Sequence, residues 1–155
     1  MAVQEMINIS TYKFVSIPEQ ELVPLRDNLR DFTRDLGLKG SILLSKEGIN
    51  AFVSGKREQI DTFHAKLETI SWLRGLQFKE SPSVGAPFKR MLVKIKNEII
   101  KMCVDHINPE EFTAPHLPAK TLKQWYEQGQ KMVILDTRNN YEIQAGKFKD
   151  TLDLN

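Results

Sequence analysis

The hydrophobic residues in the first part of the chain follow strand spacing and then helix spacing. The β-branched and aromatic run Ile9–Val15 predicts a strand. Ser16 is expected to cap the helix that follows, with Pro18 in the first turn and Glu19 completing a capping box. Gly37 suits the end of this helix. The apolar face of the helix recurs every three or four residues, at Leu22, Leu25, Leu29, Phe32 and Leu36.

Two strands and a second helix are expected next. Leu38–Leu44 and Asn50–Val53 have the composition of strands, and Gly48 between them suits a tight hairpin. A second amphipathic helix is expected to begin at about Lys56. Its apolar face is formed by Ile60, Phe63, Leu67 and Ile70.

The last strand of this region is interrupted. Leu76–Lys79 and Phe88–Ile95 both have strand character, with the turn-forming residues Ser81–Pro87 between them. The order of strand, helix, strand, strand, helix and strand predicts an α+β domain of ferredoxin-like (βαββαβ) topology over residues 1–104. In this topology both helices lie on one face of an antiparallel sheet, and the other face is exposed to solvent.

The last part of the chain has a different organisation. Its prolines predict a linker over residues 105–118. Lys120–Gln128 is expected to form a helix, and the nearly continuous apolar run Lys131–Leu135 is typical of a buried parallel strand. One such strand with one helix cannot bury both of its faces. Residues 119–155 are therefore interpreted as the incomplete start of an α/β domain.

Composition and charge narrow the class of protein. The 155 residues are 41% hydrophobic and 27% charged, which is typical of a globular protein, and no apolar run is long enough to cross a membrane. The N-terminus lacks the pattern of a secretory signal, so a cytoplasmic location is expected. Residues 1–104 carry 16 Lys and Arg against 12 Asp and Glu, whereas residues 105–155 carry 6 against 8. The positive excess permits a polyanionic partner without requiring one.

A basic segment is the strongest candidate for contact with such a partner. Within Lys89–Lys96, strand alternation sends Arg90, Lys94 and Lys96 to the same face. These cations would line the exposed face of the sheet, where RNA phosphates are natural ligands. An edge strand that lysines protect from aggregation explains the pattern equally well.

Three aromatic residues on predicted strands have two interpretations. Tyr12, Phe14 and Phe52 raise the alternative of an RNA-recognition sheet that stacks bases on aromatic rings. The glycine-aromatic consensus of that module is absent around Phe52, so we expect all three side chains to pack in the core under the helices. An acylphosphatase activity is excluded, because Val15–Pro18 is not the arginine-bearing, glycine-rich phosphate loop that it requires.

Thiol, imidazole and carboxylate side chains do not form a convincing catalytic or metal site. Cys103 follows strand-like residues rather than the helix N-terminus or base that activates a thiol, and it is interpreted as a bystander. Asp136 and Arg138 follow the buried strand and are expected to form a structural ion pair rather than acid–base machinery. No metal is expected, because metal-ligand spacing is absent among His64, His106 and His116.

Several motifs resemble known families. Val133–Glu142, followed by Gly146–Phe148, resembles the entry strand of rhodanese-like domains, which makes residues 119–155 similar to the truncated start of an α/β rhodanese-like domain. The same chain carries three further motifs, Gly40–Asn50, Ser54–Gly55 and Pro87–Lys94. Taken together and in this order, the motifs resemble the bacterial tRNA wobble-uridine hydroxylase family over nearly the whole chain.

This resemblance implies an oxygen-dependent enzyme that converts the wobble uridine of tRNA to 5-hydroxyuridine. Molecular oxygen would be a co-substrate of the full-length enzyme and tRNA its partner, while no cofactor, DNA or membrane is expected to bind this segment. The catalytic cysteine of such proteins lies in the active-site loop of the rhodanese-like domain. That loop is expected beyond Asn155, so this chain alone is expected to be inactive.

The residues that the motifs single out form two groups. RNA binding is expected at Lys46, Asn50, Arg90, Lys94 and Lys96. Support of the active-site loop is expected from Asp136, Arg138 and Glu142. Two other functions remain open: a rhodanese-type sulfurtransferase, which the Asp-Thr-Arg segment alone would allow, and a non-catalytic RNA- or protein-binding adaptor.

Overall fold

The chain consists of two compact units, Met1–Thr113 and Ala114–Asn155. The computed structural model describes residues 5–100, 104 and 107–153 of them. The division between the units falls inside residues 105–118, the segment predicted as a linker. Cys103, interpreted as a bystander thiol, and His106, one of the three histidines considered for a metal site, lie outside the described residues.

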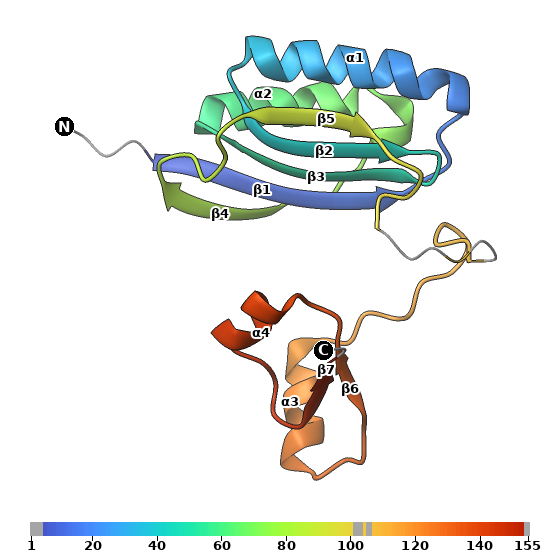
Figure 1. Cartoon of the computed structure of the whole chain (residues 1–155), viewed down its shortest axis with the longest axis vertical. Helices are drawn as coiled ribbons and strands as arrows, with labels where there is room; N and C mark the ends of the chain where they lie inside the picture. Colours follow the sequence, from blue (N-terminus) through green and yellow to red (C-terminus); the bar gives the residue numbers. More distant parts are fainter. Residues whose placement is uncertain (1–4, 101–103, 105–106, 154–155) are drawn as a thin grey trace. The chain divides into compact units, whose positions relative to one another are not determined.

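The first unit is a five-stranded sheet with two helices on one face (Figure 1). Its strands lie in the order β4-β1-β3-β2-β5, and all neighbours are antiparallel except β2 and β5. The predicted α+β, ferredoxin-like fold is confirmed, with β5 as an additional strand beside β2. The elements are β1 (Glu5–Phe14), α1 (Glu19–Asp35), β2 (Lys39–Ser45), β3 (Gly48–Gly55), α2 (Arg57–Glu68), a 3-10 turn (Ser71–Leu73), β4 (Lys79–Val84) and β5 (Met91–Ile95).

The two segments expected to share the last strand lie at opposite edges of the sheet. β4 occupies much of the stretch predicted as an interruption, and it pairs with β1. Pro82 is tolerated there because β4 is an edge strand, in which one side of the backbone needs no partner. β5 pairs in parallel with β2 instead. The single interrupted strand of the prediction is therefore wrong, and residues 85–90 connect the two edges.

The core lies between the sheet and the two helices. Leu29 of α1, Phe63 of α2 and Ile42 of β2 have no exposed surface, and they belong to one cluster of buried side chains. The predicted helix faces are confirmed, because the buried positions of α1 and α2 include Leu22, Leu25, Leu29, Ile60, Phe63 and Leu67. Helical spacing of apolar residues was sufficient to identify these faces.

The predicted role of Ser16 as a helix cap is wrong. Helix α1 begins at Glu19 with Pro18 in the N-cap position, so Ser16 lies two residues too early to reach the free amides of the first turn. The Ser16 hydroxyl instead donates to the Glu110 carboxylate at 2.6 Å, and this hydrogen bond lowers the pKa of Glu110. The serine thus connects the segment before α1 to Glu110, near the end of the first unit.

The second unit is small and has exposed apolar side chains. Its elements are α3 (Ala119–Glu127), β6 (Ile134–Asp136), α4 (Asn140–Ala145) and β7 (Thr151–Asp153). β6 and β7 form a parallel pair, and β6 begins three residues later than the predicted Lys131–Leu135 strand. Leu135 and Leu152 lie opposite each other in this pair and are 53% and 59% exposed. Among the described residues, no helix is long and apolar enough to span a membrane.

Candidate nucleic-acid interface

The predicted cations of β5 lie on the face of the five-stranded sheet opposite α1 and α2, here called the open face. Lys94 is in β5 opposite Leu43, while Arg90 and Lys96 flank the strand and continue its pairing with β2 through their backbones. The side chains of Arg90, Lys94 and Lys96, here called the basic stripe, are all exposed. Within the part of the chain that the structure describes, none of them forms an ion pair.

Two aromatic side chains expected in the core also lie on the open face. Tyr12 is 61% exposed and Phe52 is 49% exposed. The prediction was wrong because strand alternation directs Thr11 and Ala51, their neighbours, toward the helices. Phe14 is half-buried, and its ring meets that of Tyr12 edge to face at 6.0 Å between centroids. The open face therefore carries aromatic rings as well as cations.

The two hairpin residues predicted to bind RNA are engaged within the protein. Lys46 forms an exposed ion pair with Glu19, at 2.6 Å between Nζ and Oε2. The Asn50 side-chain amide donates to the Ile99 carbonyl at 3.2 Å. The Ile99 amide in turn donates to the Glu47 carboxylate at 2.6 Å. The structure thus gives Asn50 a structural contact, and it does not bring Lys46 into the basic stripe.

Glu47 is a residue that sequence reasoning missed. Together with Asn50 it binds both polar backbone groups of Ile99, whose side chain is only 3% exposed. Buried backbone groups need such partners, so the hairpin fixes the segment that leaves β5. Glu47 and Ile99 are 52 positions apart in the sequence. No local pattern could have predicted this contact.

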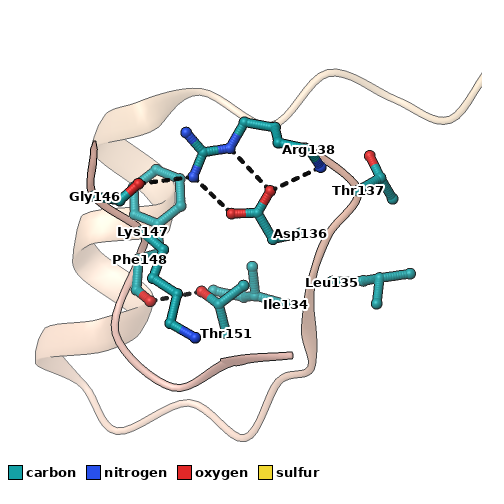
Figure 2. A pocket seen from close by; sticks show the side chains of 9 residues that line it. All are labelled: Ile134, Leu135, Asp136, Thr137, Arg138, Gly146, Lys147, Phe148 and Thr151. Carbon is teal, nitrogen blue, oxygen red and sulfur yellow. Dashed lines mark hydrogen bonds and ion pairs between the residues drawn. The ribbon is translucent and has the colours of Figure 1, made fainter. Parts of the chain in front are cut away.

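The second unit contains the predicted Asp136–Arg138 pair. Figure 2 shows the Arg138 guanidinium facing both oxygens of the Asp136 carboxylate, at 2.9 and 2.7 Å. The same guanidinium donates to the Gly146 carbonyl at 2.9 Å, which connects the end of β6 to the loop after α4. Glu142 accepts from the backbone and side chain of Asn139 at the start of α4. These contacts hold the loop after β6, next to a cavity of about 600 Å³.

The titration of Asp136 provides a test of this pair. The hydrogen bonds from Arg138 lower the pKa of Asp136 from 3.8 to about 2. A carboxylate with a lowered pKa in the folded state contributes stability above its ordinary pKa, and that contribution is lost as the pH falls from about 4 toward 2. A carboxyl carbon NMR titration should therefore place the midpoint of Asp136 near pH 2.

The matched variant is Arg138→Gln, which removes the guanidinium and its charge. In this variant the pKa of Asp136 is expected to rise toward its ordinary value, because the principal cause of the shift is absent. A wild-type midpoint near the ordinary value would mean that the ion pair does not form in solution.

Metal-binding groups do not gather in the described residues. No group of three His, Cys, Asp or Glu side chains is placed there to hold an ion. His64 lies on α2, 3.8 Å from the Glu68 carboxylate, and its ring meets that of Phe78 edge to face at 4.6 Å. His116 is exposed.

Comparisons with known proteins agree with the fold. Residues 6–99 match the family described as "UPF0176 acylphosphatase like domain". Over 96% of its length the chain is 44% identical to a protein of Delftia acidovorans named tRNA uridine(34) hydroxylase. Over 97% it is 45% identical to a protein of the same name from Cupriavidus pinatubonensis. The chain covers 58% and 55% of these relatives, a little over half of their length.

A solved structure shares the fold. BlrB, a BLUF protein in its dark state, superposes with a TM-score of 0.50 at 14% identity, over 59% of this chain and 74% of that protein. Identity at this level shows a likeness of fold alone.

Proposed function

Because the chain belongs to the family of the UPF0176 acylphosphatase-like domain, we propose that it is the RNA-binding part of a tRNA-modifying enzyme. The reaction is the hydroxylation of the wobble uridine to 5-hydroxyuridine. The name of its relatives, tRNA uridine(34) hydroxylase, supports this substrate and reaction. We place the protein in the cytoplasm, where its tRNA substrate is found.

The observation that carries the RNA-binding role is the basic stripe. Lys94 lies on the edge strand β5, Arg90 and Lys96 flank that strand, and strand alternation puts all three on the open face. The helices of the first unit cover the other face of its sheet (Figure 1). Lys94 and Lys96 are two strand residues apart, about 7 Å along the strand. Cations without ion-pair partners are free to neutralise phosphates, and such contacts position a nucleic acid without reading its sequence.

We assign the chemical step to the part of the relatives that this chain does not match. The hydroxyl oxygen would come from molecular oxygen, and no cofactor is assigned to the residues described here. Within the second unit, Asp136, Arg138 and Glu142 would hold the loop after β6 as a support for the active-site loop. Their hydrogen bonds to Gly146 and Asn139 are consistent with this positioning role.

Two other functions are alternatives to the hydroxylase. One is a sulfurtransferase, and the other is a non-catalytic RNA- or protein-binding adaptor. Nucleoside mass spectrometry of tRNA from cells that carry or lack the full-length gene distinguishes them. A hydroxylase changes the level of 5-hydroxyuridine. A sulfurtransferase leaves that level unchanged and transfers sulfur from thiosulfate in a separate assay, and an adaptor does neither.

Replacing Arg90, Lys94 and Lys96 together by serine is expected to weaken tRNA binding at low salt. Each lost phosphate contact should lower the slope of log affinity against log salt by about 1. Fluorescence anisotropy with labelled tRNA over a salt titration measures both quantities. The fold should survive, since exposed substitutions of this kind change stability by about 0.5 kcal/mol each.

The control removes the same charge from the other side of the sheet. Arg30→Ser and Arg34→Ser on α1 and Lys66→Ser on α2 lower the net charge equally. This variant is expected to bind tRNA with nearly the wild-type salt slope. Equal salt slopes for the wild type and the stripe variant would assign the stripe to solubility rather than to RNA.

A further inference from the structure

The open face carries two exposed aromatic rings that phosphate binding leaves without a role. Tyr12 lies opposite Asn50, and Phe52 lies opposite Ser10, so the two rings are diagonal neighbours on the adjacent strands β1 and β3. Diagonal side chains on paired strands are within reach of each other. Both rings are about half exposed or more, at 61% and 49%.

We propose that Tyr12 and Phe52 form a stacking platform for unpaired bases of a single-stranded RNA segment. The inference rests on the proposed function, because it assumes that RNA lies on this face, and it adds which kind of RNA the face accepts. Every base has a flat aromatic surface, so exposed rings bind unpaired nucleotides without a strong sequence preference. Bases inside a duplex are stacked on each other and cannot use such rings.

The charges of the open face favour a polyanion over another protein. Lys79 on β4 lies opposite Ser10, and Lys94 on β5 lies opposite Leu43. No strand position on this face carries Asp or Glu. The side chains directed to it from the strands belong to Met6, Asn8, Ser10, Tyr12, Phe14, Lys39, Ser41, Leu43, Ser45, Asn50, Phe52, Ser54, Lys79, Ser81, Ser83, Leu92 and Lys94. A second copy of the same face would meet it with charges of the same sign.

The register of the sheet places the rings between these edge cations. One row across the strands runs from Lys79 through Ser10 to Phe52. The next row contains Tyr12 and ends at Lys94. The two edge strands are four strand spacings apart, about 19 Å. The row of Tyr12 also contains Asn50, whose side chain holds the Ile99 carbonyl, so we place the RNA segment along the row from Lys79 to Phe52, beside the ring of Tyr12.

The test uses the whole 155-residue chain and a labelled single-stranded RNA, with a duplex of the same length as the second probe. Tyr12→Ala and Phe52→Ala are each expected to weaken single-strand binding by roughly 10-fold. The salt slope should stay unchanged, because no charge is removed. Duplex binding should also stay unchanged. Tyr12→Phe and Phe52→Tyr keep a ring at each position and should keep the affinity.

The matched control is Phe112→Ala, which removes a ring that is 74% exposed but lies outside the sheet. Circular dichroism establishes that each variant is folded, and sedimentation measures self-association. Unchanged single-strand affinity in the double alanine variant overturns the stacking proposal. An equal loss for duplex RNA, or a wild-type dimer that the variant abolishes, also overturns it.

Failure of stacking and failure of RNA binding give different results. If the aromatic variants bind normally while the stripe variant loses affinity and salt slope, only the stacking proposal fails. If the wild type binds neither probe, the proposed function fails with it.

Discussion

Replacing Gly48 by alanine is expected to destabilise the first unit by about 3 kcal/mol or more. Gly48 has a φ of +138°, a conformation that residues with a side chain rarely adopt. A Cβ there would overlap the Lys13 carbonyl oxygen and approach Phe14 Cα at 3.2 Å. Both are backbone atoms of β1, so relief of the overlap would separate β1 from β3. The midpoint of urea unfolding, followed by circular dichroism, measures the loss.

Gly85→Ala is the control for this prediction. Gly85 also has a positive φ, +77°, but a Cβ there would meet nothing within 4 Å. Its substitution should cost only the left-handed backbone penalty, about 1 to 2 kcal/mol. Equal midpoints for Gly48→Ala and Gly85→Ala would show that the close approach of β1 does not constrain the hairpin.

The hairpin also shows what sequence analysis could establish. A tight hairpin at Gly48 was predicted from the turn chemistry of a single residue, and Gly48 is the first residue of β3, opposite Ser45. Its neighbours Glu47 and Asn50 were not predicted to bind Ile99, because this contact depends on the long-range pairing of β5 with β2. Asn50 was assigned to RNA on the strength of a motif, and that assignment stays a prediction beside the structural contact.

The aromatic residues were misplaced although the sequence contained a usable signal. Alternation in β1 puts Asn8 and Ser10 on the same side as Tyr12, and two polar neighbours indicate an exposed face. The missing consensus argued only against one RNA-binding module. It did not bear on which face of the strand is buried.

Elsewhere too, features set by residues close together in the sequence were predicted correctly, whereas features set by distant residues were not. The Asp136–Arg138 pair spans two positions, and its predicted ion pair is confirmed. The assignment of residues 76–95 to one strand failed because edge position depends on which strands pair across the whole sheet. Sequence spacing identifies strands, but it does not decide which edge each one occupies.

Replacing Phe63 by alanine is expected to destabilise the first unit by about 3 to 5 kcal/mol. Phe63 lies on α2, has no exposed surface and belongs to the cluster that joins both helices to the sheet. Its removal loses buried apolar contact and leaves a cavity that a closely packed interior fills only in part. Urea unfolding should show a lower midpoint with an unchanged slope, because the surface exposed on unfolding is nearly the same.

Phe112→Ala removes the same side chain from a position that is 74% exposed, so it should change stability by about 0.5 kcal/mol or less. The difference between the two alanine variants isolates the effect of burial from the effect of composition. Because every member of the core cluster lies between Ile9 and Val93, this loss belongs to the first unit. It should therefore weaken RNA binding only at urea concentrations where that unit unfolds. If Phe63→Ala lost RNA affinity while circular dichroism still showed a folded sheet, the helix layer would contribute to the interface, contrary to its assignment to the open face.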